Sequence, residues 1–333
     1  MVFTKTHFRW ATRFLQFGLS AFFVAWIMVV VDPALVWGIF SQADLTFIFL
    51  AIIVLPVGWG LRSWRYLLLV NAFDRTHEKS VRFHHAFKGF LLFLSGNAAL
   101  PLRGGEWLRI AHIKAQYPRL PTAFLVGAAG AEKVPETIYS VLVIGLWIFL
   151  EPSDFVVFGT LIVSVFFAAS LSLTVLVSGS TALPKRVLTP GVAVISTTRL
   201  FDVMRTAASA FAVFGHLRDT VLVASATLLT RLIDTIVMLV VASALDIPLS
   251  VEASLLIGAT LSLGLTFSAL PAHIGVFEAS VVAGAAFASI EAETALAFGL
   301  GFHAVVLTGW LCAIAWSVPL LLQPVSGDGG AIK

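Results

Sequence analysis

Ionisable side chains interrupt the long apolar runs of this 333-residue chain, where a charge without a partner is costly. Arg231 and Asp234 stand three residues apart in one such run, a spacing that places both on one face of a helix and lets them pair. Lys133 and Glu136 have the same spacing in another run, directly after Glu132. Each pair predicts either a structural ion pair that holds helices together or a polar site for a charged substrate.

Two short sequences combine helix-breaking residues with charge. The first reads Asn97-Ala98-Ala99-Leu100-Pro101-Leu102-Arg103-Gly104-Gly105-Glu106-Trp107-Leu108-Arg109, and the second reads Ala269-Leu270-Pro271-Ala272-His273-Ile274-Gly275-Val276-Phe277-Glu278. Proline removes a backbone donor and glycine allows a sharp turn, so both sequences predict broken helices.

Arg103 stands directly between Pro101 and Gly104, where its guanidinium would be placed to grip a lipid phosphate with two hydrogen bonds. Glu106 and Glu278 would then hold arginines in position or respond to protons. Arg109 is either part of this grip or ordinary basic charge at the membrane edge. For His303, deep in the last apolar run, we favour a hydrogen-bonded interior histidine over a proton relay.

Composition tells us what kind of molecule must position these residues. Hydrophobic residues make up 59% of the chain and charged residues only 12%, against about 25% charged in a typical soluble domain. We therefore expect an all-α polytopic membrane protein forming one integral membrane domain over residues 1–333. The single cysteine, Cys312, excludes an intrachain disulfide framework and a CxxC metal site, and we expect no metal, no cofactor and no nucleic-acid partner.

Six apolar segments are long enough to cross a bilayer. They are residues 14–31, 45–61, 120–150, 155–177, 220–245 and 294–322. Lys and Arg gather in the N-terminus and in the regions 62–119 and 178–219, whereas the other four connections hold eight acids and no base. By the positive-inside rule, the basic loops and both termini are expected in the cytoplasm. The basic N-terminus followed by a long apolar run is expected to be an uncleaved first helix.

Two stretches fit poorly as simple crossings because the same sign of charge flanks both ends of each. These are residues 83–119, flanked by bases, and residues 253–290, flanked by acids. We expect both to be re-entrant hairpins that enter from opposite sides. Their similar central sequences predict an inverted repeat with halves at about 45–177 and 220–323, and such Pro/Gly breaks mark binding sites in transporters.

The connector between the halves, about residues 178–219, contains an amphipathic piece from Arg199 onward. It predicts either an interfacial helix on anionic inner-leaflet lipid or a loop helix packed on the bundle.

The motifs quoted above resemble those of the lysylphosphatidylglycerol synthase transmembrane region, a flippase-like family. The pattern N-x-x-L-P-x-R-x-G-E-x-x-R runs from Asn97 to Arg109, and L-P-x-x-x-G-x-x-E runs from Leu270 to Glu278. A third, E-R-x-x-D-like element departs from the family, since Lys133 and Glu136 replace its usual Arg and Asp.

The resemblance implies a lipid translocator of a bacterial inner membrane, or a membrane component of a lipid or glycolipid pathway. Stand-alone members are linked to isoprenoid-derived lipids such as hopanoids and to glycan assembly. Members that make aminoacylated lipid carry a large soluble synthase domain, which we do not expect here because the chain ends at Lys333.

We therefore expect a translocator for a phospholipid, an isoprenoid-derived lipid or a polyprenyl-linked lipid, and not an enzyme. The substrate-binding residues would come from the two breaks and from the buried charges. They are Asn97, Pro101, Arg103, Gly105, Glu106, Arg109, Glu132, Lys133, Glu136, Arg231, Asp234, Pro271, His273, Gly275 and Glu278. The alternatives are a non-catalytic partner of a lipid-biosynthetic enzyme and a polyprenyl-lipid transferase, which would need a metal-bound carboxylate cluster or a positioned base.

Overall fold

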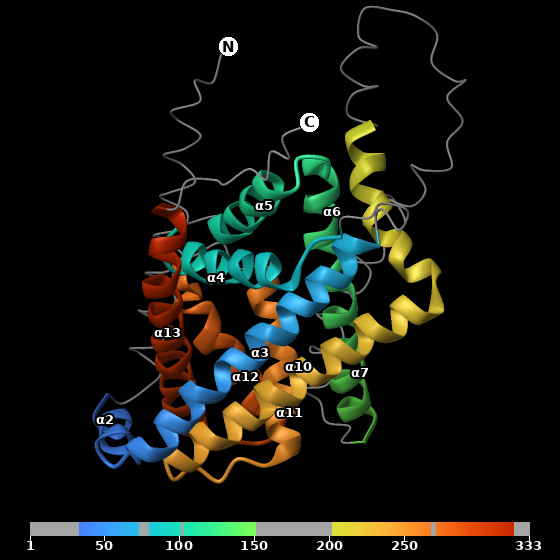
Figure 1. The fold of residues 1–333 in the computed structure, drawn as a ribbon. Coiled ribbons are helices and arrows are strands. Elements are labelled where there is room, and N and C mark those ends of the chain that lie inside the picture. Colours follow the sequence, from blue (N-terminus) through green and yellow to red (C-terminus); the bar gives the residue numbers. More distant parts are fainter. Residues whose placement is uncertain (1–32, 73–79, 101–102, 151–201, 268–270, 323–333) are drawn as a thin grey trace, which may run out of the picture. The chain divides into compact units, whose positions relative to one another are not determined.

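A computed structural model describes residues 33–72, 80–100, 103–150, 202–267 and 271–322, and every regular element in these ranges is a helix (Figure 1). This confirms the all-α prediction for the described part of the chain. The elements are α2 (Pro33–Ser41), α3 (Leu45–Asn71), α4 (Phe83–Ala99), α5 (Gly104–Gln116), α6 (Thr122–Ala131), α7 (Lys133–Leu150), η1 (Ser209–Gly215), α10 (Leu217–Ala244), α11 (Val251–Phe267), η2 (Pro271–His273), α12 (Val276–Phe287) and α13 (Ala292–Leu322).

Four described stretches are long and apolar enough to cross a membrane: Leu45–Asn71, Thr122–Leu150, Leu217–Ala244 and Ala292–Trp316. They match four of the six predicted crossings. The other two, residues 14–31 and 155–177, lie outside the described residues, so the total of six stays a prediction.

Helix α3 does not end with the predicted second crossing at Leu61 but continues to Asn71 and carries Arg62 and Arg65 within it. A positive charge after an apolar run predicts that the helix has left the membrane. Arg65 is instead only 2% exposed and finds carboxylate partners inside the protein, so its charge does not have to end the helix.

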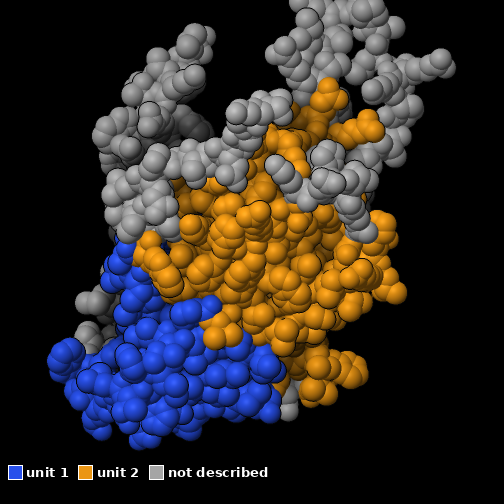
Figure 2. Space-filling model, viewed as in Figure 1, with its two compact units in different colours: residues 1–56, 93–105, 232–315 blue, residues 57–92, 106–231, 316–333 orange. Residues whose placement is uncertain are grey.

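Two compact units make up the structure (Figure 2). The unit boundaries divide several helices, which are α3, α4, α5, α10 and α13. Unit 1 comprises residues 1–56, 93–105 and 232–315, and unit 2 comprises residues 57–92, 106–231 and 316–333. Their boundaries differ from the predicted repeat halves, which were defined by sequence likeness rather than by packing. The repeat halves stay a prediction.

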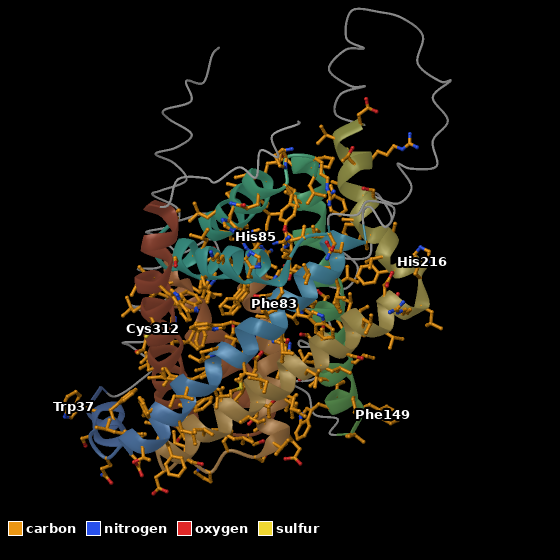
Figure 3. The ribbon with its side chains drawn as sticks, viewed as in Figure 1. Trp37, Phe83, His85, Phe149, His216 and Cys312 are labelled. Carbon is orange, nitrogen blue, oxygen red and sulfur yellow. The ribbon has the colours of Figure 1, made fainter. Side chains whose placement is uncertain are left out.

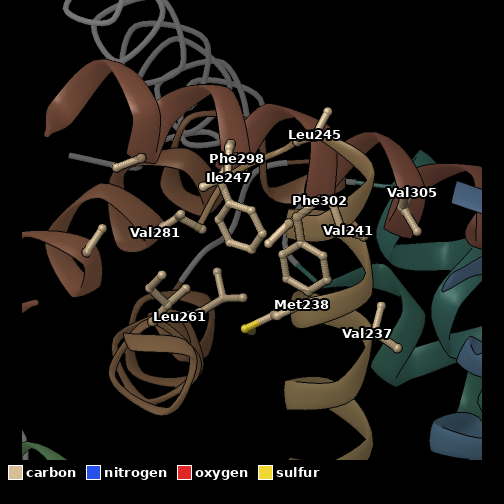
Figure 4. Close-up of a cluster of buried hydrophobic side chains, with 14 of the residues drawn as sticks. Val237, Met238, Val241, Leu245, Ile247, Leu261, Val281, Phe298, Phe302 and Val305 are labelled. Atoms are coloured by element: carbon tan, nitrogen blue, oxygen red, sulfur yellow. The ribbon is translucent and has the colours of Figure 1, made fainter. Parts of the chain in front are cut away.

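The core of unit 1 is built from apolar side chains of α10, α11, α12 and α13, together with Ala51 of α3. Phe298 and Phe302 of α13 stack with ring centroids 5.8 Å apart, and Met238 of α10 belongs to the same cluster (Figure 4). Unit 2 has a separate core, to which α3, α5, α6, η1 and α10 contribute. Each unit therefore has its own apolar support for the polar groups described below.

Helix α11 packs on α12, with the one-turn helix η2 between them in the chain. With 17 and 12 residues, the two helices are about 25 and 18 Å long, shorter than a hydrocarbon core of about 30 Å. The first predicted hairpin has the same plan, with 17 residues in α4 and 13 in α5. Both predicted helix breaks are thus confirmed, whereas their re-entry into the membrane stays a prediction.

The amphipathic connector is helical from residue 202 to 208 and continues into η1, which packs on α6. Ala208, Ala210 and Val213 are buried. This packing favours the second of the two alternatives, a loop helix that lies on the bundle.

Close packing of α11 on α12 depends on Gly284, since a Cβ there would lie 2.6 Å from the Cα of Ile257. We expect Gly284→Ala to lower the free energy of unfolding by about 1–3 kcal/mol, the usual cost of overpacking. Gly258→Ala is the matched control on α11, because its Cβ would meet only Met238 Cε, at 3.8 Å. Chemical denaturation in detergent measures both variants. Equal stability of the two would show that α11 and α12 do not pack as described.

Candidate functional site

Seven ionisable side chains form a charge cluster inside unit 2. Four are cations and three are carboxylates: Arg65, Arg109, Lys133 and Arg231, with Glu106, Glu132 and Glu136. They come from α3, α5, α7 and α10 and from Glu132, the residue that joins α6 to α7. We call this set the unit 2 charge cluster.

Glu136 is the centre of one part of the unit 2 charge cluster. Its Oε1 lies 2.5 Å from Arg65 Nη2 and 3.7 Å from Arg231 Nη2, and its Oε2 lies 3.1 Å from Lys133 Nζ. Arg65 Nη1 also donates to Thr227 Oγ1 at 3.2 Å. Three helices, α3, α7 and α10, are therefore joined at one carboxylate.

Arg109 is the centre of the other part. Its Nη2 lies 2.7 Å from both Glu106 Oε2 and Glu132 Oε2, and its guanidinium lies 4.0 Å from the ring centroid of Tyr66. Glu132 connects the two parts, since its Oε1 is 3.7 Å from Arg65 Nη2. Charged groups can be buried at this depth only when they are paired in this way.

Most of the unit 2 charge cluster is inaccessible. Arg65 and Arg109 are each 2% exposed, Glu132 is 4% exposed and Glu136 is 7% exposed, whereas the side chain of Lys133 is 30% exposed. Such burial points to a structural role for the four buried residues and leaves Lys133 as the accessible cation. Their predicted contacts with substrate stay predictions.

Arg65 is the member that sequence reasoning missed. Its place in the basic region 62–119 predicts a cytoplasmic position, whereas its partners Glu132 and Glu136 lie about seventy residues further along the chain. The signal that was available is position: Arg65 follows an unbroken apolar run by only a few residues. The predicted Arg231–Asp234 pair stays a prediction, because Asp234 belongs to unit 1 and Arg231 to unit 2.

In unit 1 the two helix breaks lie together. Arg103 has a φ of 56° directly before α5, and its Nη1 donates to the backbone oxygen of Thr266 at 2.5 Å. Thr266 is in the last turn of α11, just before the second break. A guanidinium suits this place because the carbonyl end of a helix carries partial negative charge. Arg103 thus lies at the first break and reaches the second, whereas its predicted grip on a phosphate stays a prediction.

The start of α5 is packed tightly against α4. Gly105 donates its N–H to Asn97 Oδ1 at 3.1 Å, and a Cβ on Gly105 would overlap the carbonyl oxygen of Phe93. Asn97 is 3% exposed. These contacts explain both residue types without a ligand, and substrate contact by either residue stays a prediction. Pro101 lies outside the described residues.

The second break is held by Glu278 and His303. His303 Nδ1 lies 2.5 Å from Glu278 Oε1, and His303 Nε2 lies 2.9 Å from the backbone oxygen of Ala272. Glu278 Oε2 accepts the N–H of Gly275 at 2.8 Å. The preference for a hydrogen-bonded interior histidine at position 303 therefore fits the structure. The sequence did not reveal its partner, because 25 residues separate it from Glu278.

The remaining predicted residues of the second break are placed around this contact. Pro271 begins η2, and Gly275 caps α12 with a φ of 83°. His273 is buried, and its ring meets the ring of Trp310 edge-on at 5.8 Å between centroids. Among the described residues, no three His, Cys, Asp or Glu side chains are grouped to hold a metal ion.

Comparison with protein-family models matches residues 13–315 to the lysylphosphatidylglycerol synthase TM region. The match spans nearly the whole chain, including both breaks and the unit 2 charge cluster. The chain belongs to this family. The resemblance inferred from its motifs is thereby confirmed, and this member of the synthase membrane-region family is a multi-pass membrane protein. Comparisons with curated proteins and with solved structures gave no match.

The contacts of Glu136 in the unit 2 charge cluster of this family member yield an asymmetric prediction. Glu136 is shared by three cations, whereas Lys133 contacts a carboxylate that two arginines also approach, so losing Glu136 should cost more stability than losing Lys133. We expect Glu136→Gln to destabilise the protein by roughly 3–5 kcal/mol, because buried cations lose their shared partner. Lys133→Met, the control, removes a partly exposed cation and should cost less than about 1 kcal/mol. Chemical denaturation in detergent measures the free energy of unfolding of both variants. A larger loss of stability in Lys133→Met than in Glu136→Gln would contradict the central place of Glu136 in the cluster.

A second prediction concerns His112 of α5, a helix that is not among the four candidate spans. Its pKa is lowered to about 4, first by burial and then by the basic neighbours His85 (labelled in Figure 3), Lys88 and His84. An unfolded histidine takes up a proton near pH 6.5, so between pH 6.5 and 4 only the unfolded state gains one. Stability should therefore fall as pH falls through this window.

His112→Gln removes this contribution, and its melting temperature should decline less between pH 6.5 and 4.5 than that of the parent protein. Differential scanning fluorimetry in buffered detergent measures the two curves. Parallel curves would show that His112 is not held neutral by the fold.

Proposed function

We propose that this family member moves a lipid with a phosphate-bearing headgroup from one leaflet to the other. The headgroup would be held at the helix breaks of unit 1 while the acyl or isoprenoid tails remain in the bilayer. Six crossings and two re-entrant hairpins, with both termini in the cytoplasm of a bacterial cell, are part of this proposal. No catalytic step is assigned to the chain.

The observation that carries the proposal is the hydrogen bond between Arg103 and the carbonyl of Thr266. It brings a guanidinium from the first break to the end of α11, where the second break begins. Broken helices at membrane depth persist only where they are buried in protein or line a wet cavity. In transporters with repeated halves, substrates bind where such breaks meet.

The chemistry of Arg103 suits a phosphate. The residue is only half-buried, so it remains within reach of a headgroup, and a guanidinium can present two parallel N–H groups to phosphate oxygens. A phosphate that competes with the Thr266 carbonyl would exchange a neutral acceptor for a charged one. A phosphate oxygen adds the attraction between opposite charges and can accept two parallel hydrogen bonds from the guanidinium, so this exchange favours binding.

The test is transbilayer movement in proteoliposomes, followed with fluorescent phospholipids that a membrane-impermeant reductant quenches only in the outer leaflet. We expect Arg103→Ala to slow movement roughly 10- to 100-fold, the equivalent of one or two charge-assisted hydrogen bonds. Arg103→Lys keeps the positive charge but loses the two parallel N–H groups, so its rate of lipid movement should lie between those of the parent protein and Arg103→Ala. Arg119→Ala, at an exposed position after α5, is the matched control and should be unchanged.

Mass spectrometry of lipids that co-purify with the protein complements the movement assay. One lipid class enriched with the parent protein and lost from Arg103→Ala would name the headgroup. A folded Arg103→Ala protein that moves lipid at the parent rate would contradict the proposed contact between Arg103 and the headgroup. No movement of any lipid by the parent protein would instead favour a non-catalytic partner of a lipid-biosynthetic enzyme.

A further inference from the structure

We propose that Glu278 and His303 form a proton-binding site whose occupancy sets the shape of the second helix break. The proposal rests on the function proposed above, because it supplies the ion that would drive lipid movement.

The hydrogen bonds of His303 require a fixed number of protons. The Ala272 oxygen can only accept, so the His303 Nε2 that faces it at 2.9 Å must carry a hydrogen. The contact of 2.5 Å between His303 Nδ1 and Glu278 Oε1 needs one further proton, carried by either atom. Both contacts are therefore satisfied only while this shared proton is present, and the pair then has no net charge.

Loss of the shared proton to water leaves an ionised Glu278 beside a neutral His303. A neutral imidazole has one N–H, but it would still face two acceptors, so one of its two hydrogen bonds must break. If Nδ1 keeps the hydrogen, the bond to Ala272 is lost; if Nε2 keeps it, the bond to Glu278 is lost. In both cases an unpaired acceptor is left in a buried place, and the break must rearrange.

The second break is strained in a way that makes rearrangement favourable. Ala272 and His273 have φ values of 53° and 59°, a left-handed conformation that non-glycine residues rarely adopt because Cβ comes too close to the carbonyl oxygen. Glu278 holds the far side of the same turn through the N–H of Gly275. Hydrogen bonds to His303 and Glu278 thus hold the strained turn at both ends, at Ala272 and at Gly275. Breaking one of these hydrogen bonds allows the strain to relax.

In the chain, the same turn follows the α11 end that Arg103 contacts, with residues 268–270 between them. Thr266 is five residues before Pro271 in the chain, and its carbonyl accepts from Arg103. A change in the turn would therefore alter the acceptor that competes with a headgroup for Arg103. This is the physical link between proton binding and lipid binding.

Other charged groups are few on the elements that pack around the pair. The nearest in sequence is His273, whose ring lies against Trp310. Helix α10 carries Asp234, and the packed helices α11 and α13 carry Glu252 and Glu293 in their first turns. Glu293 is ten residues from His303, about 15 Å along the helix, and Glu252 is about 21 Å from Thr266.

The first experiment measures the mobility of the turn and does not depend on lipid movement. Cys312, which is exposed, is replaced by serine, and a nitroxide is attached at Ile274→Cys in the turn. Electron paramagnetic resonance in proteoliposomes should show that the mobility of the nitroxide rises with pH. The ratio of closed to mobile turn should change from about 10:1 to about 1:10 over roughly 2 pH units, as expected for the loss of one proton. A nitroxide at the exposed position Leu311 of α13 is the control and should not respond.

Two variants distinguish proton loss from general loosening. In Glu278→Gln the amide can donate to His303 Nδ1 without a titratable proton, so the turn should stay closed at every pH. In His303→Ala the hydrogen bond to the Ala272 oxygen is absent, so the turn should be mobile at every pH. A pH response that persists in Glu278→Gln, or no response in the parent protein, would overturn the proposal.

The second experiment imposes a gradient of 1 pH unit across proteoliposomes and measures the leaflet distribution of the fluorescent lipid. Coupling to one proton should sustain up to a tenfold asymmetry in the parent protein. Glu278→Gln should lose it. Lipid movement without asymmetry would contradict the proposed coupling to protons but would support lipid translocation. A pH-sensitive turn without any lipid movement would contradict lipid translocation but would support the proton-binding site.

Discussion

The absence of water in a bilayer interior governs where this chain places its polar groups. An unpaired backbone group or charge in hydrocarbon costs several kcal/mol, so each helix break and each charge must find its partner within the protein. Arg103 satisfies the end of α11, and Glu278 satisfies the start of α12. Both contacts replace backbone hydrogen bonds that are missing at the second break, and Asn97 does the same for the N–H of Gly105 at the first break.

The two predicted hairpins meet this constraint with similar parts arranged differently. Each has a helix of 17 residues, a break with at least one left-handed residue among those described, and a shorter helix with a glutamate in its first turn. In the first hairpin, Glu106 pairs with Arg109 one turn further along α5. In the second, Glu278 reaches His303 on α13. A repeat that kept the break while changing the glutamate's partner would account for both the likeness and the difference.

Features that depend on local composition were predictable from the sequence. The four described crossings follow from apolar length, and both breaks follow from proline and glycine beside charge. Features that depend on long-range pairing were not. Arg65 was assigned to the cytoplasm because its carboxylate partners Glu132 and Glu136 are distant in the chain, and charge alone appeared to end the helix. The Glu278–His303 contact was hidden for the same reason, since helix periodicity says nothing about a neighbouring helix.

The two groups of charges differ in how readily they can change state. In the unit 2 charge cluster, Glu136 is shared by three cations, so removing any one contact leaves the others in place. Such a network resists change, because leaving a buried charge unpaired costs roughly 3–5 kcal/mol. Glu278 and His303 depend instead on one shared proton, and the loss of that proton removes one of their contacts outright. A conformational change that is driven by small free energies would therefore begin at the second break of unit 1, where one proton decides whether the hydrogen bonds are complete.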